Sequence, residues 1–207
     1  MFKGEMSLRN FNEEYSLVRF LHAVPNGETV DVYVNGVPFF NDLDFTKFTP
    51  YVYLPKGTYT VEVFNEDTVE NPLVMQELDI NNDELLTVAI IIDNGAVKLL
   101  PIKEDKELAP GKQSKVRFVH LVPNGRDVNI SLGGNQAFEN VKYMDATKYE
   151  LLDPGEYDTD VASSINNDII NSSQIKINPN RIYTFYAIGE APNFEVLQSL
   201  DGATFLI

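Results

Sequence analysis

The sequence predicts an all-β protein built from two tandem antiparallel β-sandwich domains, of immunoglobulin-like or transthyretin-like topology. Three observations predict this fold class. One long segment occurs twice, apolar and polar residues alternate over short runs, and Asn, Gly and Pro separate those runs. Alternation with a period of two places one face of a strand in a core, so these runs predict half-buried strands joined by turns.

The repeat is the strongest of the three observations. VRFLHAVPNG at 18–27 recurs as VRFVHLVPNG at 116–125, 98 residues further along the chain. The correspondence continues without a gap as far as GTY at 57–59, which matches GEY at 155–157. A match of this length indicates an internal duplication, and each copy is therefore expected to form the same fold.

The repeat also predicts the domain boundaries. The segment between the copies, KEDKELAPGKQ, is charged, carries Pro110 and Gly111 and lacks alternation, which is typical of a linker. We expect four parts: an N-terminal extension (1–16), a first sandwich (17–102), a linker (103–114) and a second sandwich (115–207).

Within each copy, short dipeptides mark the hairpins. A two-residue hairpin needs positive φ at both central positions, which Asn and Gly tolerate. The predicted hairpin turns are Asn35-Gly36, Asn94-Gly95 and, replacing the first of these in the second copy, Gly133-Gly134.

The strands themselves follow from side-chain type. The apolar run from Val88 to Ile92 is short and β-branched, which predicts a buried strand. After the Pro-Lys-Gly turn, Tyr59, Val61 and Val63 share one face of a strand. The second copy has Thr159 in place of Val61. No segment shows a helical period with caps.

Composition excludes several classes of function. The chain of 207 residues has no cysteine, so it has no disulfide, thiolate metal site or cysteine nucleophile. Its net charge of −15 argues against binding to nucleic acid or to anionic membranes. The N-terminus has no apolar run of signal-peptide length, and no stretch approaches a membrane span, so we expect neither ordinary export nor membrane insertion.

The two histidines, His22 and His120, occupy equivalent positions. No nucleophile, base or zinc motif accompanies them, and we expect no enzymatic activity and no catalytic residue. The alternation puts each at the inner end of a strand, where it is expected to hydrogen-bond backbone groups. A ligand contact is the alternative, and the two histidines are too far apart in sequence to suggest a shared metal.

Other candidate ligand-binding residues also occur in pairs. Arg19 and Arg117 could clamp a carboxylate, although pairing with an acidic neighbour on a sheet face is the simpler expectation. Tyr51 lies among several phenylalanines, and Tyr149 is its equivalent. Exposed aromatic rings can form a sugar platform, and packing within the protein is the alternative.

Cofactors are not expected. The acidic runs Asp79 to Glu84 and Asn166 to Asp168 offer oxygens to calcium, but neither has the spacing of an EF-hand loop. Calcium is therefore only a minor alternative to solvated loops at these positions.

The motifs also resemble a known family. VRFLHAVPNGETVDVYVNG at 18–36 and FTPYVYLPKGTYTVEVF at 48–64 are similar to the DUF4397 family of bacterial proteins, and LQSLDGATFL looks like the end of tandem members from Firmicutes. The resemblance covers nearly all of 17–207, with small departures such as Asn129 in place of Asp. It implies a β-rich, often duplicated domain of cell-surface or spore-associated proteins, with no established activity and no catalytic residues.

These observations lead to two hypotheses about function. The first is a non-enzymatic structural protein of a bacterial cell or spore surface, with the spore coat favoured because no signal peptide is present and a cytoplasmic location as the alternative. It would associate with itself or other surface proteins by β-strand addition through its N-terminal extension and the apolar end Ala203 to Ile207. The second is a surface binding module for glycan or peptide ligands.

Overall fold

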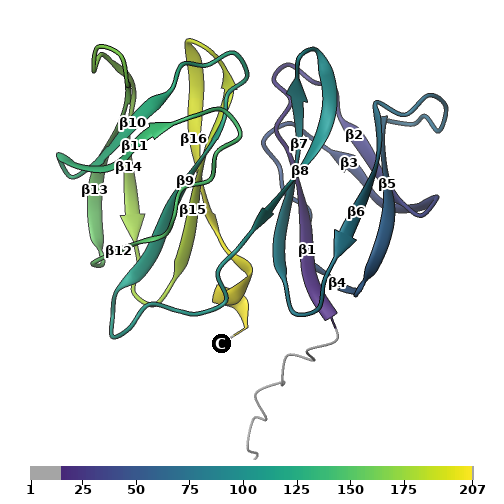
Figure 1. The fold of residues 1–207 in the computed structure, drawn as a ribbon, viewed down its shortest axis with the longest axis horizontal. Coiled ribbons are helices and arrows are strands. Elements are labelled where there is room, and N and C mark those ends of the chain that lie inside the picture. Colours follow the sequence, from purple (N-terminus) through teal and green to yellow (C-terminus); the bar gives the residue numbers. More distant parts are fainter. Residues whose placement is uncertain (1–14, 207) are drawn as a thin grey trace, which may run out of the picture.

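The structure is a computed structural model that describes residues 15–206. In these residues it contains sixteen strands and one short 3-10 helix. The strands form two β-sandwiches that lie side by side (Figure 1). The predicted all-β fold with two tandem sandwiches is confirmed.

The first sandwich consists of two four-stranded sheets, with strand orders β4-β1-β7-β8 and β3-β2-β5-β6. Its strands are β1 (Tyr15–His22), β2 (Val30–Val34), β3 (Val37–Leu43), β4 (Val52–Pro55), β5 (Gly57–Asn65), β6 (Val74–Ile80), β7 (Leu85–Asp93) and β8 (Ala96–Lys103).

The second sandwich repeats this arrangement, with strand orders β12-β9-β15-β16 and β11-β10-β13-β14. Its strands are β9 (Ser114–Leu121), β10 (Val128–Leu132), β11 (Asn135–Val141), β12 (Glu150–Leu152), β13 (Gly155–Ser163), β14 (Ile169–Ile177), β15 (Ile182–Glu190) and β16 (Asn193–Leu200).

The strand order distinguishes between the two topologies that the sequence leaves open. An immunoglobulin-like sandwich pairs its strands in the orders ABED and CFG. Here the order 4-1-7-8 over 3-2-5-6 is transthyretin-like. The sheets are antiparallel, as predicted, except at one pair in each copy, where β1 runs parallel to β7 and β9 runs parallel to β15. The chain crosses to the outer sheet and back between these strands, which allows them to run in the same direction.

The predicted hairpin turns are all present, and each has positive φ at both central residues. The values are 52° and 74° at Asn35-Gly36, 50° and 80° at Asn94-Gly95, and 58° and 78° at Gly133-Gly134.

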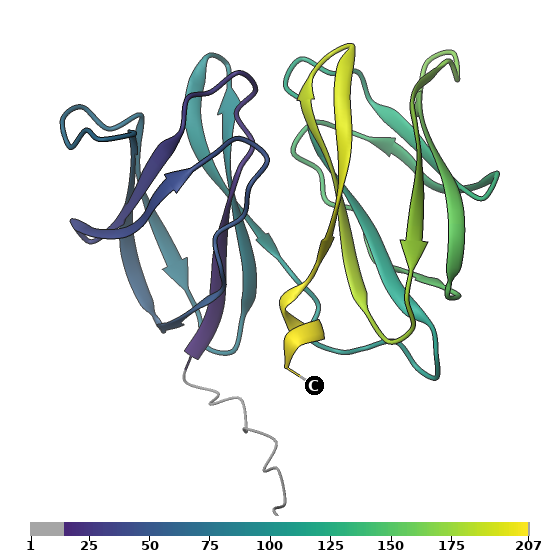
Figure 2. The same cartoon turned by 180° about the vertical axis from the view of Figure 1, so that it is seen from behind.

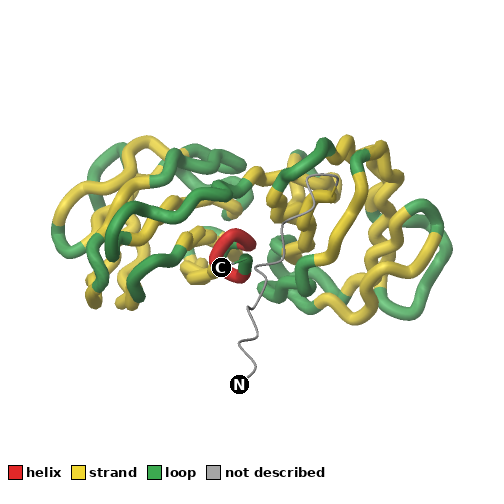
Figure 3. Tube along the Cα trace, turned by 90° about the horizontal axis from the view of Figure 1, so that it is seen from below, coloured by secondary structure: helices red, strands yellow, loops and turns green. Residues whose placement is uncertain are grey.

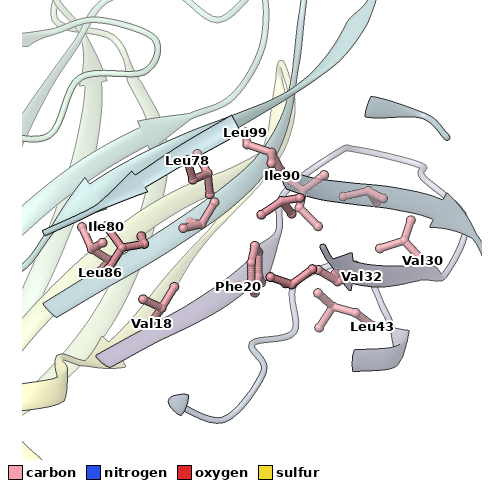
Figure 4. Close-up of a cluster of buried hydrophobic side chains, with 14 residues drawn as sticks. Val18, Phe20, Val30, Val32, Leu43, Leu78, Ile80, Leu86, Ile90 and Leu99 are labelled. Atoms are coloured by element: carbon pink, nitrogen blue, oxygen red, sulfur yellow. The ribbon is translucent and has the colours of Figure 1, made fainter. Parts of the chain in front are cut away.

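Each sandwich has its own apolar core between its two sheets. In the first copy, Val18 and Phe20 of β1 meet Val32 of β2, with Tyr59, Val61 and Val63 beside them. Figure 4 shows the labelled members of this cluster, Val18, Phe20 and Val32 among them, gathered between the strands. The second core repeats this pattern with Val116, Phe118 and Ile130.

A third apolar cluster joins the two sandwiches. The sheet that contains β1 and β7 faces the sheet that contains β9 and β15, so the sandwiches pack with these inner sheets in contact (Figures 1 and 2). Leu21 and Ala89 of the first copy lie in this cluster with Val119 and Tyr186 of the second. The inner sheets are therefore buried on both faces, which explains why the predicted buried strand, now β7, is apolar on both sides.

The C-terminal segment corrects one prediction. Gly202–Phe205 form the 3-10 helix η1 rather than the end of a strand, and η1 lies between the two sandwiches (Figure 3). Ala203 packs there against Leu17 and Ile182. Because this segment packs inside the chain's own interface, it does not present the edge strand that the self-association hypothesis requires. The N-terminal half of that hypothesis falls on residues 1–14, which lie outside the described residues.

Candidate functional site

The six candidate residues lie in two places. Arg19, Arg117, Tyr51 and Tyr149 meet at one end of the interface between the sandwiches, near η1. The two histidines lie at the other end of β1 and β9. The arginine and the histidine of each strand also lie on opposite faces of the sheet, because side chains alternate between the two faces along a strand.

Arg19 contacts residues from three elements. Its Nε donates a hydrogen bond of 2.8 Å to Thr87 Oγ1 of β7. Its guanidinium lies 4.4 Å from the centre of the Phe48 ring and 4.5 Å from that of Tyr51. Nη2 approaches Glu104 to 3.5 Å, and both side chains are buried.

Arg117 repeats these contacts in the second copy. Its Nε donates to Thr184 Oγ1 at 2.9 Å, and its guanidinium lies 4.5 Å from the centre of the Tyr149 ring. Its Nη2 is 3.9 Å from Asp201. Nη1 crosses to the first copy and donates to the carbonyl of Lys103 at 2.6 Å.

The two carboxylates accept hydrogen bonds from nearby tyrosine and threonine hydroxyls and from the backbone. Glu104 accepts from Tyr51 at 2.8 Å, from Thr87 at 2.5 Å and from the backbone N–H of Gly202 at 2.8 Å. Asp201 accepts from Tyr149 at 2.5 Å and from Thr184 at 2.7 Å. Glu104 therefore links the first sandwich to η1 of the second.

We call these residues the interface charge cluster: Arg19, Tyr51, Thr87, Glu104, Arg117, Tyr149, Thr184 and Asp201. The prediction that each arginine pairs with an acidic neighbour is confirmed, but the expectation of a weak surface pair is wrong. The pairs are buried because the other repeat covers the sheet face that carries them. Removing one partner of such a buried pair lowers the stability of the protein strongly, because the other charge is left buried and unpaired.

Burial sets the proton affinities in the cluster. Desolvation, together with the nearby charge of Glu104, raises the pKa of Asp201 to about 7. Desolvation and the adjacent carboxylates also raise the pKa of Tyr51 and of Tyr149, so both phenols stay protonated as donors. Burial alone would lower the pKa of Arg19, but the neighbouring tyrosines and carboxylates raise it overall.

The histidines have a different role. His22 Nε2 lies 2.9 Å from the carbonyl of Glu28, and its Nδ1 accepts from the N–H of Val24 at 3.3 Å. His120 makes the same two contacts with Arg126 and Val122. Burial lowers the pKa of both rings, so the neutral form with a proton on Nε2 satisfies both contacts. The expected backbone hydrogen bonds are confirmed, and each ring holds its Val-Pro-Asn-Gly turn in place.

Metal ligands do not gather in this part of the chain. Among residues 15–206, no group of three or more His, Asp or Glu side chains is arranged to hold a metal ion. No helix in the same residues is long and apolar enough to cross a membrane.

A pocket of about 350 Å³ opens in the second sandwich beside His120, and we call it the loop-end pocket. Its wall includes apolar side chains from Val122, Val128 and Ile170, with the ring of Phe194. Its polar residues are Asn124, Arg126, Ser163, Asn166 and Asp168.

Three segments build this pocket, and all three differ from the first copy. Arg126 stands where the first copy has Glu28. The β13–β14 loop is shorter than the β5–β6 loop. Phe194 follows the β15–β16 turn at the position of Val97. Gly189, at φ 123°, allows this packing, because a Cβ there would lie 3.1 Å from the Cα of Phe194.

His120, a candidate ligand contact from the sequence, lines this pocket, and Asn166 and Asp168 belong to the acidic run considered for calcium. The other lining residues were not among the sequence-based candidates. A signal for the pocket was present in the sequence, at positions where the two copies differ. Arg126 and Phe194 replace Glu28 and Val97, and a duplicated sequence shows such differences directly.

Comparison with known proteins gives a family and distant structural likenesses. No curated protein matches the chain. A solved structure of a family 26 carbohydrate-binding module from Eubacterium rectale Amy13K, in complex with maltoheptaose, has 10% sequence identity and a TM-score of 0.28, covering 91% of this chain and 99% of that chain. A structure of family 41 carbohydrate-binding modules from streptococcal virulence factors, which recognise α-glucan, has 12% identity and a TM-score of 0.29, covering 87% of this chain and 96% of that chain.

Likeness at this level does not transfer a ligand to this chain. The family match is of a different kind, because it rests on the sequence and covers both repeats. The profile of DUF4397, a domain of unknown function, matches residues 16–131 and 114–204. The chain belongs to the DUF4397 family.

Proposed function

We propose that this protein is a non-catalytic binding module, and that its loop-end pocket binds an uncharged glycan. The observation that carries the proposal is the pocket itself, which combines an apolar floor with a rim of amide, hydroxyl, carboxylate and guanidinium groups. Small-molecule sites in proteins have this composition and a volume from about 300 Å³ upward.

The chemistry of the rim favours a sugar. Hydroxyl groups both donate and accept hydrogen bonds, and the rim offers amides that do both, a carboxylate that accepts and a guanidinium that donates. The ring of Phe194 adds an apolar surface for the C–H face of a sugar ring. Arg126 is exposed and, within the described residues, makes no ion pair, so its donors face solvent.

Calorimetric titration with N-acetylglucosamine and glucose, and with their tetramers chitotetraose and maltotetraose, tests the proposal. Arg126→Glu installs the residue of the first copy and should weaken sugar binding about tenfold. The matched control is Glu28→Arg, which makes the reverse change in the first copy and should leave binding unchanged.

Phe194→Val provides a second test, because it installs the residue of the first copy in place of the ring. Loss of affinity in both pocket variants supports the proposal. Absence of sugar binding, or binding that both variants leave intact, would overturn it, and a peptide that binds at the pocket instead would replace the glycan.

Structural assembly on a bacterial cell or spore surface is the second candidate. Phe205 and Leu206 support it, because they leave exposed apolar surface beside η1. This candidate agrees with three predictions from the sequence: a Firmicute source, a spore-coat location, and association with itself or with other surface proteins. Light scattering of the whole chain and of a variant with Phe205→Ser would test it, and a monomer in both cases would contradict self-association.

A further inference from the structure

We infer that the outer sheet of the second sandwich carries a second glycan subsite, next to the loop-end pocket, so that the ligand is an oligosaccharide rather than a single sugar. This inference rests on the proposed function. It starts from a hollow of about 250 Å³ on the outer face of β10, β11 and β13, which we call the outer-sheet hollow.

The internal duplication shows how the hollow arises. In the first copy, the outer face carries Tyr33 on β2 and Phe64 on β5, with ring centres 5.2 Å apart. Phe64 is buried and Tyr33 is half-buried, so these rings cover the sheet. At the same two positions, 98 residues later, the second copy has Ser131 and Ala162.

The two central strands beneath these faces pair in the same register in both copies. β2 pairs with β5 so that Asp31 lies opposite Phe64, and β10 pairs with β13 so that Asn129 lies opposite Ala162. The second copy therefore keeps the register of these two strands and lacks the two rings. The hollow is the space that the missing aromatic side chains leave.

The lining of the hollow indicates the class of ligand. Its polar residues are Asn129, Ser131, Gln136, Asp160 and Asn167, with Ala162 and Gly134 between them. No cation lines it, so it does not suit an anion, and a single carboxylate is too few for a metal ion. Amide and hydroxyl groups around a smooth floor suit an uncharged molecule rich in hydroxyl groups.

Part of this lining is held in place. Asn129 donates to Asn167 at 3.2 Å and accepts from the N–H of Asn140 at 2.9 Å. Asp160 accepts from Ser172 at 2.6 Å through one oxygen. These contacts fix Asn129, Asn167 and Asp160, while Gln136 is exposed and lines the hollow from the edge strand β11.

The two sites share one loop. Asn166 and Asp168 line the loop-end pocket, while Asn167 and Ile169 line the outer-sheet hollow. Successive residues of the β13–β14 connection thus face opposite sides. A linear chain of sugars that crosses this loop would contact both sites, whereas a single sugar would occupy only one.

The test compares each monosaccharide with its tetramer by calorimetric titration. The wild-type protein should bind chitotetraose or maltotetraose about tenfold more tightly than the matching monomer. Ser131→Tyr with Ala162→Phe restores the rings of the first copy and should remove this advantage, with binding of the monomer unchanged. Gln136→Ala should reduce it without altering the sheet, and it covers the case in which the double variant fails to fold.

Gln174→Ala, on the same sheet but outside the lining, is the matched control and should behave as the wild type. Equal affinity for monomer and tetramer, or an advantage that survives in both hollow variants, would overturn the subsite while leaving the loop-end pocket intact. If none of the four sugars binds, both proposals are overturned.

Discussion

At the scale of single residues, each histidine depends on the glycine of its turn. A Cβ at Gly27 would lie 2.9 Å from His22 Cε1 and 3.0 Å from the carbonyl of Val24. Gly125 has the same relation to His120, with a distance of 3.0 Å to Cε1. The glycines are therefore required by the close approach of the imidazole ring and not by a positive φ.

This relation gives a first prediction. Gly27→Ala should lower the free energy of unfolding by about 1–3 kcal/mol, because the ring must move away from the carbonyl of Glu28 and leave a buried group unpaired. Chemical denaturation measures the effect. Gly125→Ala should act similarly, and a wild-type stability in both variants would contradict the assigned role of the ring.

A second prediction uses a difference between the copies. Thr159 is buried, and its Oγ1 has no hydrogen-bond partner among the described residues, whereas the first copy has Val61 there. Thr159→Val should raise the free energy of unfolding by about 1 kcal/mol, because it removes an unpaired buried hydroxyl and keeps the shape. Val61→Thr is the matched reverse change and should lower the free energy of unfolding. A Thr159→Val variant with a lower free energy of unfolding than the wild type would contradict the prediction.

At the scale of elements, the interface charge cluster lies where β8 and β16 end. Glu104 and Asp201 each follow the last residue of these strands, and each faces the arginine of its own copy. The sequence did not predict this correspondence, because loop lengths differ by one residue and the offset of 98 no longer aligns the two carboxylates. Glu104 also lay in the segment predicted to be a linker.

The third prediction concerns pH. The pKa of Asp201 is raised from 3.8 to about 7, so between these values the native state holds a proton that the unfolded state releases. The contribution of Asp201 to stability therefore rises as the pH falls through this window. The lowered pKa values of His22 and His120 act oppositely, since their contribution is lost as the pH falls below 6.5.

The wild type is therefore compared with Asp201→Asn. Both proteins contain the two histidines, so the histidine contribution cancels in the difference. On acidification from about pH 8 to about pH 5, the wild type should gain on the order of 2 kcal/mol of unfolding free energy relative to the variant. Denaturation at a series of pH values measures this difference. A difference that is constant with pH would show that Asp201 does not take up a proton in this range.

At the scale of the whole molecule, the sequence predicts each sandwich well but not their association. The period of two put Val18, Phe20 and His22 on one face and Arg19 on the other, as the structure has them. What covers the second face could not be predicted, because that depends on the other repeat. The apolar character of both faces of β7 was the one local signal of this contact.

The fourth prediction follows from the shared interface. Because apolar residues and buried charges of both copies meet there, the sandwiches should unfold together in one calorimetric transition. Arg117→Met should lower the stability of that single transition by about 3–5 kcal/mol, since it leaves Asp201 buried without its cation. Two separate transitions in the wild type would contradict a coupled pair of sandwiches.

Ligand binding also concerns the whole molecule, because the two proposed sites arise from differences between two copies of one fold. Both copies keep the Val-Pro-Asn-Gly turns, core residues and strand-end histidines that the sandwich needs. They differ at the loop-end pocket and at the outer-sheet hollow. Ligand binding is therefore expected in the second copy, and the first copy packs against it.

Titration of the isotope-labelled protein with chitotetraose and maltotetraose, followed by backbone amide NMR shifts, shows which copy binds the sugar. We predict saturable shifts at Asn124, Asn166 and Asn167 in the second copy, and none at Tyr33 or Phe64 in the first. Shifts confined to the first copy, equal shifts in both copies, or no shifts with either sugar would contradict the claim.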